Sequence, residues 1–180
     1  MLLERRSYPR KELLQPSELK GIFVPTITPF KKRFGKIQLD VASHERQIKR
    51  LADPNMRMDG IFLGSNAGQG RDMDMDNLKL SIFKGIKAAR SVNKNIPVVV
   101  GALRESLNEV LEVVKYAEES GADAVVLAPG FTKGNIYDTL AVVSAYTKLP
   151  IIIYNNPGFQ NKKNLPIEFI QEAAKNKQVV

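Results

Sequence analysis

The chain has 180 residues, of which 43% are hydrophobic, a formal net charge of +8 and no cysteine. This length is enough for one domain with a buried core, and the lack of cysteine excludes a disulfide framework, thiolate-bound zinc and thiol catalysis. No run of about 18 apolar residues occurs, so we predict no transmembrane helix. The basic residues are scattered, and no DNA-reading motif accompanies them. We therefore expect a soluble, cytoplasmic protein with neither a nucleic-acid nor a membrane partner.

Short apolar runs alternate with longer amphipathic segments along the chain. The apolar runs predict strands at 21–25, 59–64, 96–101, 124–127 and 151–154, with a sixth beginning at 179–180. Three- and four-residue apolar spacing predicts helices that begin near residue 40, at 76–91, at 106–121, at 137–147 and from Pro166. The segment from Pro25 through Gly35 is predicted to be a turn-rich loop.

The predicted strands are continuous hydrophobic runs, which is typical of parallel strands covered by helices. Five strand–helix units leave two architectures open, a doubly wound sheet or a (β/α)8 barrel. In both, ligands bind at the carboxyl ends of the strands. A barrel usually takes about 250 residues, so a barrel would be represented here by its first five units.

Two loop segments are candidates for ligand binding. The loop from Gly64 to Gly70 follows a strand and precedes a helix, but it matches neither the dinucleotide fingerprint nor a P-loop. It is either a structural turn or a site that holds a carboxylate through backbone N–H groups. The acidic run from Asp72 to Asp76 lacks the glycine and glutamate of a calcium loop, so we predict no metal site and expect Asp74 or Asp76 to cap the next helix.

Four further residues are assigned from their positions alone. Ser106 with Glu109 forms a capping-box pattern. His44 is the only histidine, too few for a typical zinc site, and is predicted to lie on the surface. Tyr154 ends a buried strand, where it is either an aromatic cap on the core or a proton relay.

Six segments in order resemble the family of N-acetylneuraminate lyase and dihydrodipicolinate synthase, the pyruvate-dependent class I aldolases. The segments are Thr28-Pro29-Phe30, Asp59-Gly60-Ile61 running into Gly64-Ser65-Asn66, Pro97 to Gly101, Gly121 to Ala124, Pro129, and Tyr154-Asn155-Asn156-Pro157. The resemblance covers about residues 20–180 and favours the (β/α)8 TIM barrel over the doubly wound sheet.

The resemblance also implies a chemistry. In this family a lysine at the end of the sixth strand forms a Schiff base with pyruvate or another 2-oxo acid, which supports carbon–carbon bond formation or cleavage with an aldehyde. Ser65 and Asn66 would bind the carboxylate of the 2-oxo acid, and Tyr154 would relay protons as a catalytic residue. The resemblance implies no cofactor and no metal, and a homo-oligomer is expected.

The sequence departs from the family pattern in several places. The loop after the second strand is about one residue longer, with Gln69 where a glutamate is common. Gly130-Phe131 replaces an aromatic pair, so a tyrosine hydroxyl is lost. Phe159 or Gln160 stands where dihydrodipicolinate synthases carry an arginine, which argues against a true synthase of that kind.

The Schiff-base lysine is expected only a few residues beyond Val180. We therefore predict an N-terminal extension at residues 1–20 and a partial TIM-barrel aldolase domain at 21–180. Three alternatives stay open: an inactive truncated family member, a half-barrel whose partner chain supplies the lysine, and a doubly wound module that binds a phosphate ligand at residues 64–70.

Overall fold

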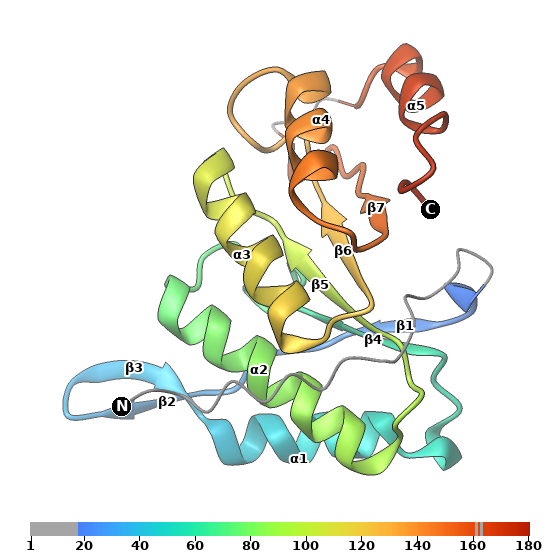
Figure 1. The fold of residues 1–180 in the computed structure, drawn as a ribbon. Coiled ribbons are helices and arrows are strands. Elements are labelled where there is room, and N and C mark those ends of the chain that lie inside the picture. The colour runs from blue at the N-terminus through green and yellow to red at the C-terminus, as the bar shows by residue number, and fades with distance from the viewer. Residues whose placement is uncertain (1–17, 161, 163) are drawn as a thin grey trace.

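A computed structural model describes residues 18–160, 162 and 164–180. Its main feature is a five-stranded sheet in the order β1-β4-β5-β6-β7, with every neighbouring pair parallel (Figure 1). The strands are β1 Phe23–Pro25, β4 Gly60–Leu63, β5 Val98–Ala102, β6 Ala124–Leu127 and β7 Ile151–Ile153. The order of the strands in the sheet follows their order in the chain, as in a (β/α)8 barrel, where each strand pairs with the next. The doubly wound alternative, which requires a reversal of strand order, is excluded.

The connections are helical, as the apolar spacing predicts. The helices are α1 Val41–Ala52, η2 Pro54–Met56, α2 Met75–Val92, α3 Leu107–Ser120, α4 Ile136–Tyr146 and α5 Ile167–Ala173. Figure 1 shows α1 to α4 on one face of the curved sheet, with α5 near β7. A sixth strand begins where it was predicted, because Val179 forms a parallel bridge with Ile151.

Local signals explain most of the helix ends. The Asp74 carboxylate accepts the backbone N–H of Asn77 at 2.8 Å and caps α2, and this bond lowers the pKa of Asp74. Gly121 ends α3 in the left-handed conformation that glycine adopts without strain. Ser106 stands at the N-cap of α3 but makes no side-chain capping bond, so the predicted capping box does not form.

Alternate residues of the strands enter two separate clusters of buried side chains. Val98, Val100 and Val125 belong to the larger cluster, which fills the layer between the sheet and the helices. Val99 and Val126 belong to the smaller cluster on the opposite, concave face, which corresponds to the barrel interior. Because both faces are covered by side chains, the strands are apolar throughout.

The loop predicted between Pro25 and Gly35 is in part a β-hairpin, which corrects the sequence analysis. Strand β2 spans Phe30–Arg33 and pairs antiparallel with β3, which spans Lys36–Leu39. The apolar alternation that signals a strand is missing, because the middle of the ribbon is exposed on both faces. Only the end pair, Phe30 with Leu39, approaches the core.

His44 is buried rather than on the surface, which corrects a second prediction. Its side chain is 1% exposed, and its Nε2 donates to the backbone carbonyl of Ser81 at 3.0 Å. His44 lies four and eight residues before Ile48 and Ala52, the other buried residues of α1, and so shares their face. Burial lowers the pKa of His44, because the imidazolium would lose its hydration.

The lowered pKa of His44 predicts acid sensitivity of the fold. The unfolded state binds a proton below about pH 6.5, whereas the folded state resists it until a lower pH. The free energy of unfolding should therefore be highest above about pH 6.5 and fall as the pH drops through the interval between the two pKa values. Urea titrations from pH 5 to 8 measure this slope, and His44→Gln should flatten it. An unchanged slope in the variant would assign the acid sensitivity to other groups.

One buried ion pair lies at the amino end of the sheet. Arg90 of α2 and Asp123, which directly precedes β6, have side chains 7% and 3% exposed and form a charge-assisted hydrogen bond. The second guanidinium nitrogen of Arg90 donates to the carbonyl of Ile96, and the Asp123 carboxylate accepts the N–H of Val98 at 2.7 Å. The pair therefore joins the end of α2 to the beginnings of β5 and β6.

Candidate active site

The candidate site is built on the carboxyl edge of the sheet, where the loop after β4 is held by a network of turns. The N–H groups of Gly68 and Gly70 both donate to the carbonyl of Ser65, at 3.1 and 3.0 Å. A Cβ on Gly70 would lie 2.0 Å from the carbonyl oxygen of Gly64, so only glycine lets the loop close on itself. Thr28 Oγ1 donates to the carbonyl of Gly68 at 2.7 Å and ties the loop to the segment after β1.

Ser65 and Asn66 differ in their exposure and in their hydrogen bonds within the protein. Ser65 is 2% exposed, and its Oγ accepts the N–H of Gly68 at 3.1 Å and donates to the carbonyl of Thr26 at 3.4 Å. Asn66 and Ala67 are exposed, and within the described part of the chain neither their backbone N–H groups nor the Asn66 amide donates a hydrogen bond. Two consecutive N–H groups beside a carboxamide make an arrangement suited to an anion.

Tyr154 follows β7 directly and lies at the same edge of the sheet. Its backbone N–H donates to the carbonyl of Leu127 at 2.8 Å, which extends the strand pairing by one residue. The half-buried ring packs on the concave-face cluster, with its centroid 6.2 Å from that of Phe159. The phenol oxygen accepts a hydrogen bond from Asn156 Nδ2 at 2.6 Å, so its own proton is left to donate elsewhere.

The structure does not bring the three predicted residues into contact. Ser65 and Asn66 follow β4 and Tyr154 follows β7, and two strands, β5 and β6, lie between them. All three residues follow the carboxyl end of a strand and therefore lie at the same edge of the sheet. That they line one site stays a prediction.

Two arginines that the sequence analysis did not single out, Arg104 and Arg71, lie at this edge. Arg104, 6% exposed, donates to the carbonyls of Gly70, Arg71 and Met73, and its own carbonyl accepts Thr132 Oγ1 at 3.0 Å. The loops after β4, β5 and β6 are therefore joined through one residue, by its side chain to the first and by its backbone carbonyl to the last. An arginine directly after an apolar strand is the only sequence signal for this role.

Arg71 places a positive charge beside Phe159, one of the two residues expected to stand where dihydrodipicolinate synthases carry an arginine. Its guanidinium carbon lies 5.6 Å from the ring centroids of both Phe131 and Phe159, and these rings are 4.2 Å apart. Such stacking is a favourable cation–π contact. The guanidinium also pairs with Asp72, Nε to Oδ1 at 2.9 Å. Arg71 thus supplies, from the loop after β4, a cation beside the ring that packs against Tyr154.

A groove of about 600 Å³ runs beside this edge. It is lined by Arg71, Asp72, Met73, Asp74, Met75, Arg104, Glu105, Glu109 and Phe131. Ser65, Asn66 and Tyr154 do not contribute to it, whereas Arg71 and Arg104 of the same edge do. Within the described residues no cluster of three metal-ligating side chains occurs, and no helix is long and apolar enough to cross a membrane.

Comparison with known proteins decides the family. The model of the dihydrodipicolinate synthetase family matches residues 18–180. The chain belongs to this family. The strand order, the loop after β4 and the tyrosine after β7 are therefore parts of a family (β/α)8 barrel, of which this chain forms the first five units and the start of the sixth strand.

Similar proteins carry more than one name. An uncharacterized DapA-like lyase of Thermococcus kodakarensis is 27% identical over 153 residues, or 83% of this chain and 49% of the relative. A 4-hydroxy-tetrahydrodipicolinate synthase of Thermosipho africanus is 30% identical over 152 residues, or 82% and 48%. The dihydrodipicolinate synthase of Acinetobacter baumannii, solved with pyruvate, is 26% identical with a TM-score of 0.65 over 78% of this chain and 47% of its own. The chain spans about half the length of the proteins it matches.

Proposed function

We propose that residues 18–180 are the first half of a pyruvate-dependent class I aldolase. The observation that carries this proposal is the match to the family along the whole described chain, with the Asn66 loop and Tyr154 at one edge of the sheet. The pyruvate complex of the Acinetobacter baumannii relative supports a 2-oxo acid as the first substrate. The cytoplasmic location and the homo-oligomer stay predictions from the sequence.

In this proposal the 2-oxo acid carboxylate binds at the loop after β4. The N–H groups of Asn66 and Ala67 and the Asn66 carboxamide are the donors left for it. Ser65 acts through its contacts with Gly68 and Thr26, which hold the loop in shape. Preorganised donors of this kind bind an anion without a further ordering cost.

Tyr154 is proposed to relay protons during imine formation and carbon–carbon bond making or breaking. Asn156 fixes the phenol through its oxygen lone pair, which leaves the O–H free to donate to a reacting group and to take the proton back. The nucleophilic lysine is proposed to come from sequence beyond residue 180 or from a second chain. Without it, the 180-residue chain should not form the imine.

The aldehyde partner is not fixed by these residues. Relatives of similar identity are named both as lyases and as synthases. Phe159 or Gln160 stands in place of the family arginine. Arg71 lies over the Phe159 ring, which keeps acidic aldehydes among the candidate substrates together with sugar-derived ones.

Borohydride trapping with pyruvate tests the proposal. The 180-residue chain should give no pyruvate adduct by intact mass. A chimera in which the C-terminal half of the Thermosipho africanus synthase completes the barrel should give one adduct, and Tyr154→Phe in the chimera should slow its formation by about a hundredfold. A folded chimera that forms no adduct would overturn the aldolase proposal. An adduct on the short chain would mean that one of its own lysines is the nucleophile.

The half-barrel alternative is tested on the same material. Strand β1 has no second neighbour among the described residues, so this edge is open to pairing with a strand that closes the barrel. Co-purification of the chain with a separate polypeptide that carries the lysine would favour two chains over one.

A further inference from the structure

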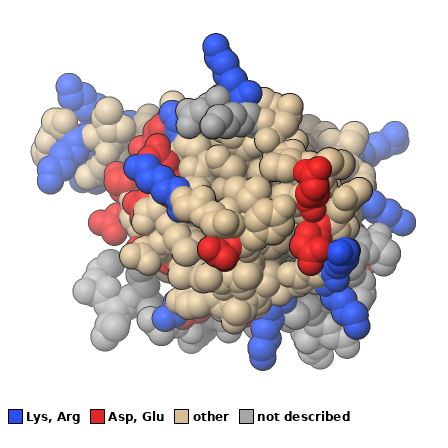
Figure 2. All heavy atoms as spheres, turned by 90° about the horizontal axis from the view of Figure 1, so that it is seen from above, with Lys and Arg blue, Asp and Glu red and all other residues tan. Residues whose placement is uncertain are grey.

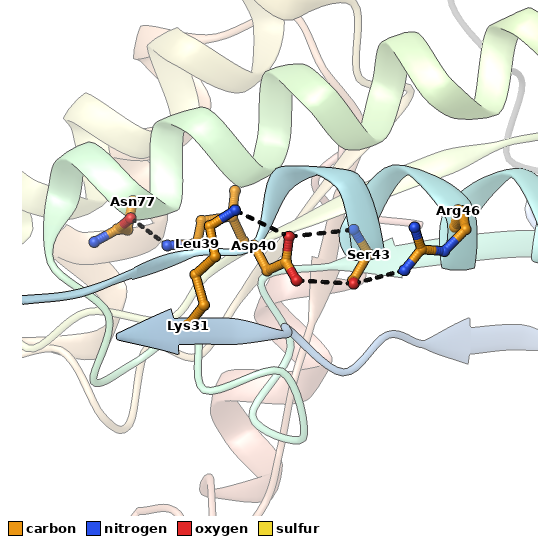
Figure 3. Close-up of polar contacts among 6 residues, drawn as sticks. All are labelled: Lys31, Leu39, Asp40, Ser43, Arg46 and Asn77. Carbon is orange, nitrogen blue, oxygen red and sulfur yellow. Dashed lines mark hydrogen bonds and ion pairs between the residues drawn. The ribbon is translucent and has the colours of Figure 1, made fainter. Parts of the chain in front are cut away.

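The β2–β3 hairpin projects away from the body of the protein but is fixed at its base. Figure 1 shows it extending beyond the ends of α1 and α2. At the base, the N–H of Leu39 donates to Asn77 Oδ1 at 3.0 Å, and the Asp40 carboxylate binds Ser43 Oγ at 2.8 Å and Lys31 at 3.4 Å (Figure 3). The ribbon is therefore held to both helices, while among the described residues its far end forms no hydrogen bond or ion pair with the rest of the protein.

The far end, which we call the hairpin tip, comprises residues 32–37 and combines three cations with two large apolar side chains. Phe34 is 90% exposed and Ile37 is 69% exposed. The cations Lys32, Arg33 and Lys36 are all exposed, and no acidic side chain of the described residues pairs with them. Arg33 lies over the Phe34 ring, with the guanidinium carbon 5.3 Å from its centroid.

Two features of the hairpin tip are unfavourable for the isolated protein. Phe34 has φ of +48° at the first position of the turn, a conformation that asparagine or glycine adopts more readily. Arg33 and Lys36 are direct cross-strand partners, and like charges in this position repel each other. A hairpin selected for its own stability would carry neither, and a bound anionic surface would relieve the repulsion between Arg33 and Lys36.

We propose that the hairpin tip binds an anionic phospholipid surface. Phe34 and Ile37 enter the boundary between headgroups and acyl chains, while Lys32, Arg33 and Lys36 contact the phosphates. This contact is peripheral and needs no membrane-spanning helix, the feature on which the expectation of no membrane partner was based. The proposal is independent of the proposed catalytic function.

A lipid surface fits this hairpin tip better than a nucleic acid does. Nucleic-acid surfaces use a continuous basic groove with several aromatic stacking platforms. Figure 2 instead shows Lys and Arg side chains gathered on the projection at the upper left and separate from one another elsewhere on this face, with no continuous basic groove between them. Of the two apolar side chains at the hairpin tip, Ile37 has no ring on which a base could stack.

Two substitutions separate lipid binding from folding. Phe34→Asn places a residue suited to the left-handed turn and removes the ring. Arg33→Glu turns a repulsive cross-strand pair into an attractive one and changes the net charge by two units. Both variants should therefore fold at least as well as the original chain. Lys87→Glu, at an exposed position of α2, changes the net charge equally and serves as the control.

Co-sedimentation of the 180-residue chain with sucrose-loaded vesicles measures the binding. The chain should bind vesicles that contain about one-third phosphatidylserine more tightly than neutral phosphatidylcholine vesicles, and the more so at low salt. Arg33→Glu should weaken this binding by about 25-fold and Phe34→Asn by about fivefold, whereas Lys87→Glu should change it much less.

Four results would overturn the proposal. Equal binding to both kinds of vesicle would show that binding does not depend on the negative charge of the lipid. Equal losses in Arg33→Glu and Lys87→Glu would show an effect of net charge alone. Phe34-dependent binding of a single-stranded oligonucleotide without vesicle binding would assign the hairpin tip to nucleic acid, and Phe34-dependent self-association in sedimentation velocity would assign it to a second copy of the chain.

Discussion

Asp123→Ala should lower the free energy of unfolding by about 3–5 kcal/mol, the range expected when one member of a buried ion pair is removed. The change leaves the Arg90 guanidinium buried without its counter-charge, and it takes away the acceptor of the Val98 N–H. Because the pair joins α2 to the beginnings of β5 and β6, the loss should be felt by the whole sheet. Urea unfolding followed by circular dichroism measures it.

Two further variants show whether the unpaired charge is the cause. Asp138→Ala, at an exposed acidic position in the first turn of α4, should cost about 0.3–1 kcal/mol. Combining Asp123→Ala with Arg90→Met should cost less than the sum of the two single changes, because the double variant leaves no buried charge. Additive costs in this cycle would contradict the interpretation.

Gly70→Ala should disrupt the loop that carries Asn66, with a cost to stability of about 3 kcal/mol. The new Cβ would lie 2.0 Å from the carbonyl oxygen and 2.5 Å from the carbonyl carbon of Gly64, and neither backbone atom can move without opening the turn. Arg104 would also lose the alignment of the Gly70 carbonyl to which it donates. Thermal unfolding measures the stability, and chemical shifts of residues 64–73 report the loop.

Gly158→Ala is the matched control for this change. The nearest atom to its Cβ is the Asn156 side-chain oxygen at 3.3 Å, a contact that a shift of a few tenths of an ångström relieves. This variant should therefore unfold at close to the temperature at which the original chain unfolds. If Gly70→Ala is equally well tolerated, the close backbone approach within the loop is not a constraint on its sequence.

The sheet could be predicted from sequence because its strands bury both faces. Val98, Val99 and Val100 alternate between the helix layer and the concave face, so an unbroken apolar run is what this position in a barrel requires. Gly121 and Asp74 marked helix ends through local backbone chemistry that depends on few neighbours. Features with a local physical cause were therefore predicted well.

The features that the sequence analysis missed have different physical causes, and only one of them depends on partners far away in the chain. Arg104 is recognisable only once the carbonyls of the preceding loop are known to surround it. The hairpin strand β2 has consecutive cations where a strand usually alternates apolar and polar residues. Its Phe34-Gly35 turn is also not a common hairpin sequence. The burial of His44 could have been predicted from its four-residue spacing to Ile48, had that spacing been weighed above the polarity of the side chain.

The unequal size of the two buried clusters has a consequence for the kinetics of folding. The larger cluster joins each strand to helices close to it in sequence, whereas the smaller one lines the concave face. Contacts between near neighbours in the chain form with little loop-closure entropy, so each strand–helix unit can add to the one before it during synthesis. The bridge between Ile151 and Val179 fixes the register of the strand that follows β7. We therefore expect vectorial assembly, with closure of the barrel as a late and slow step.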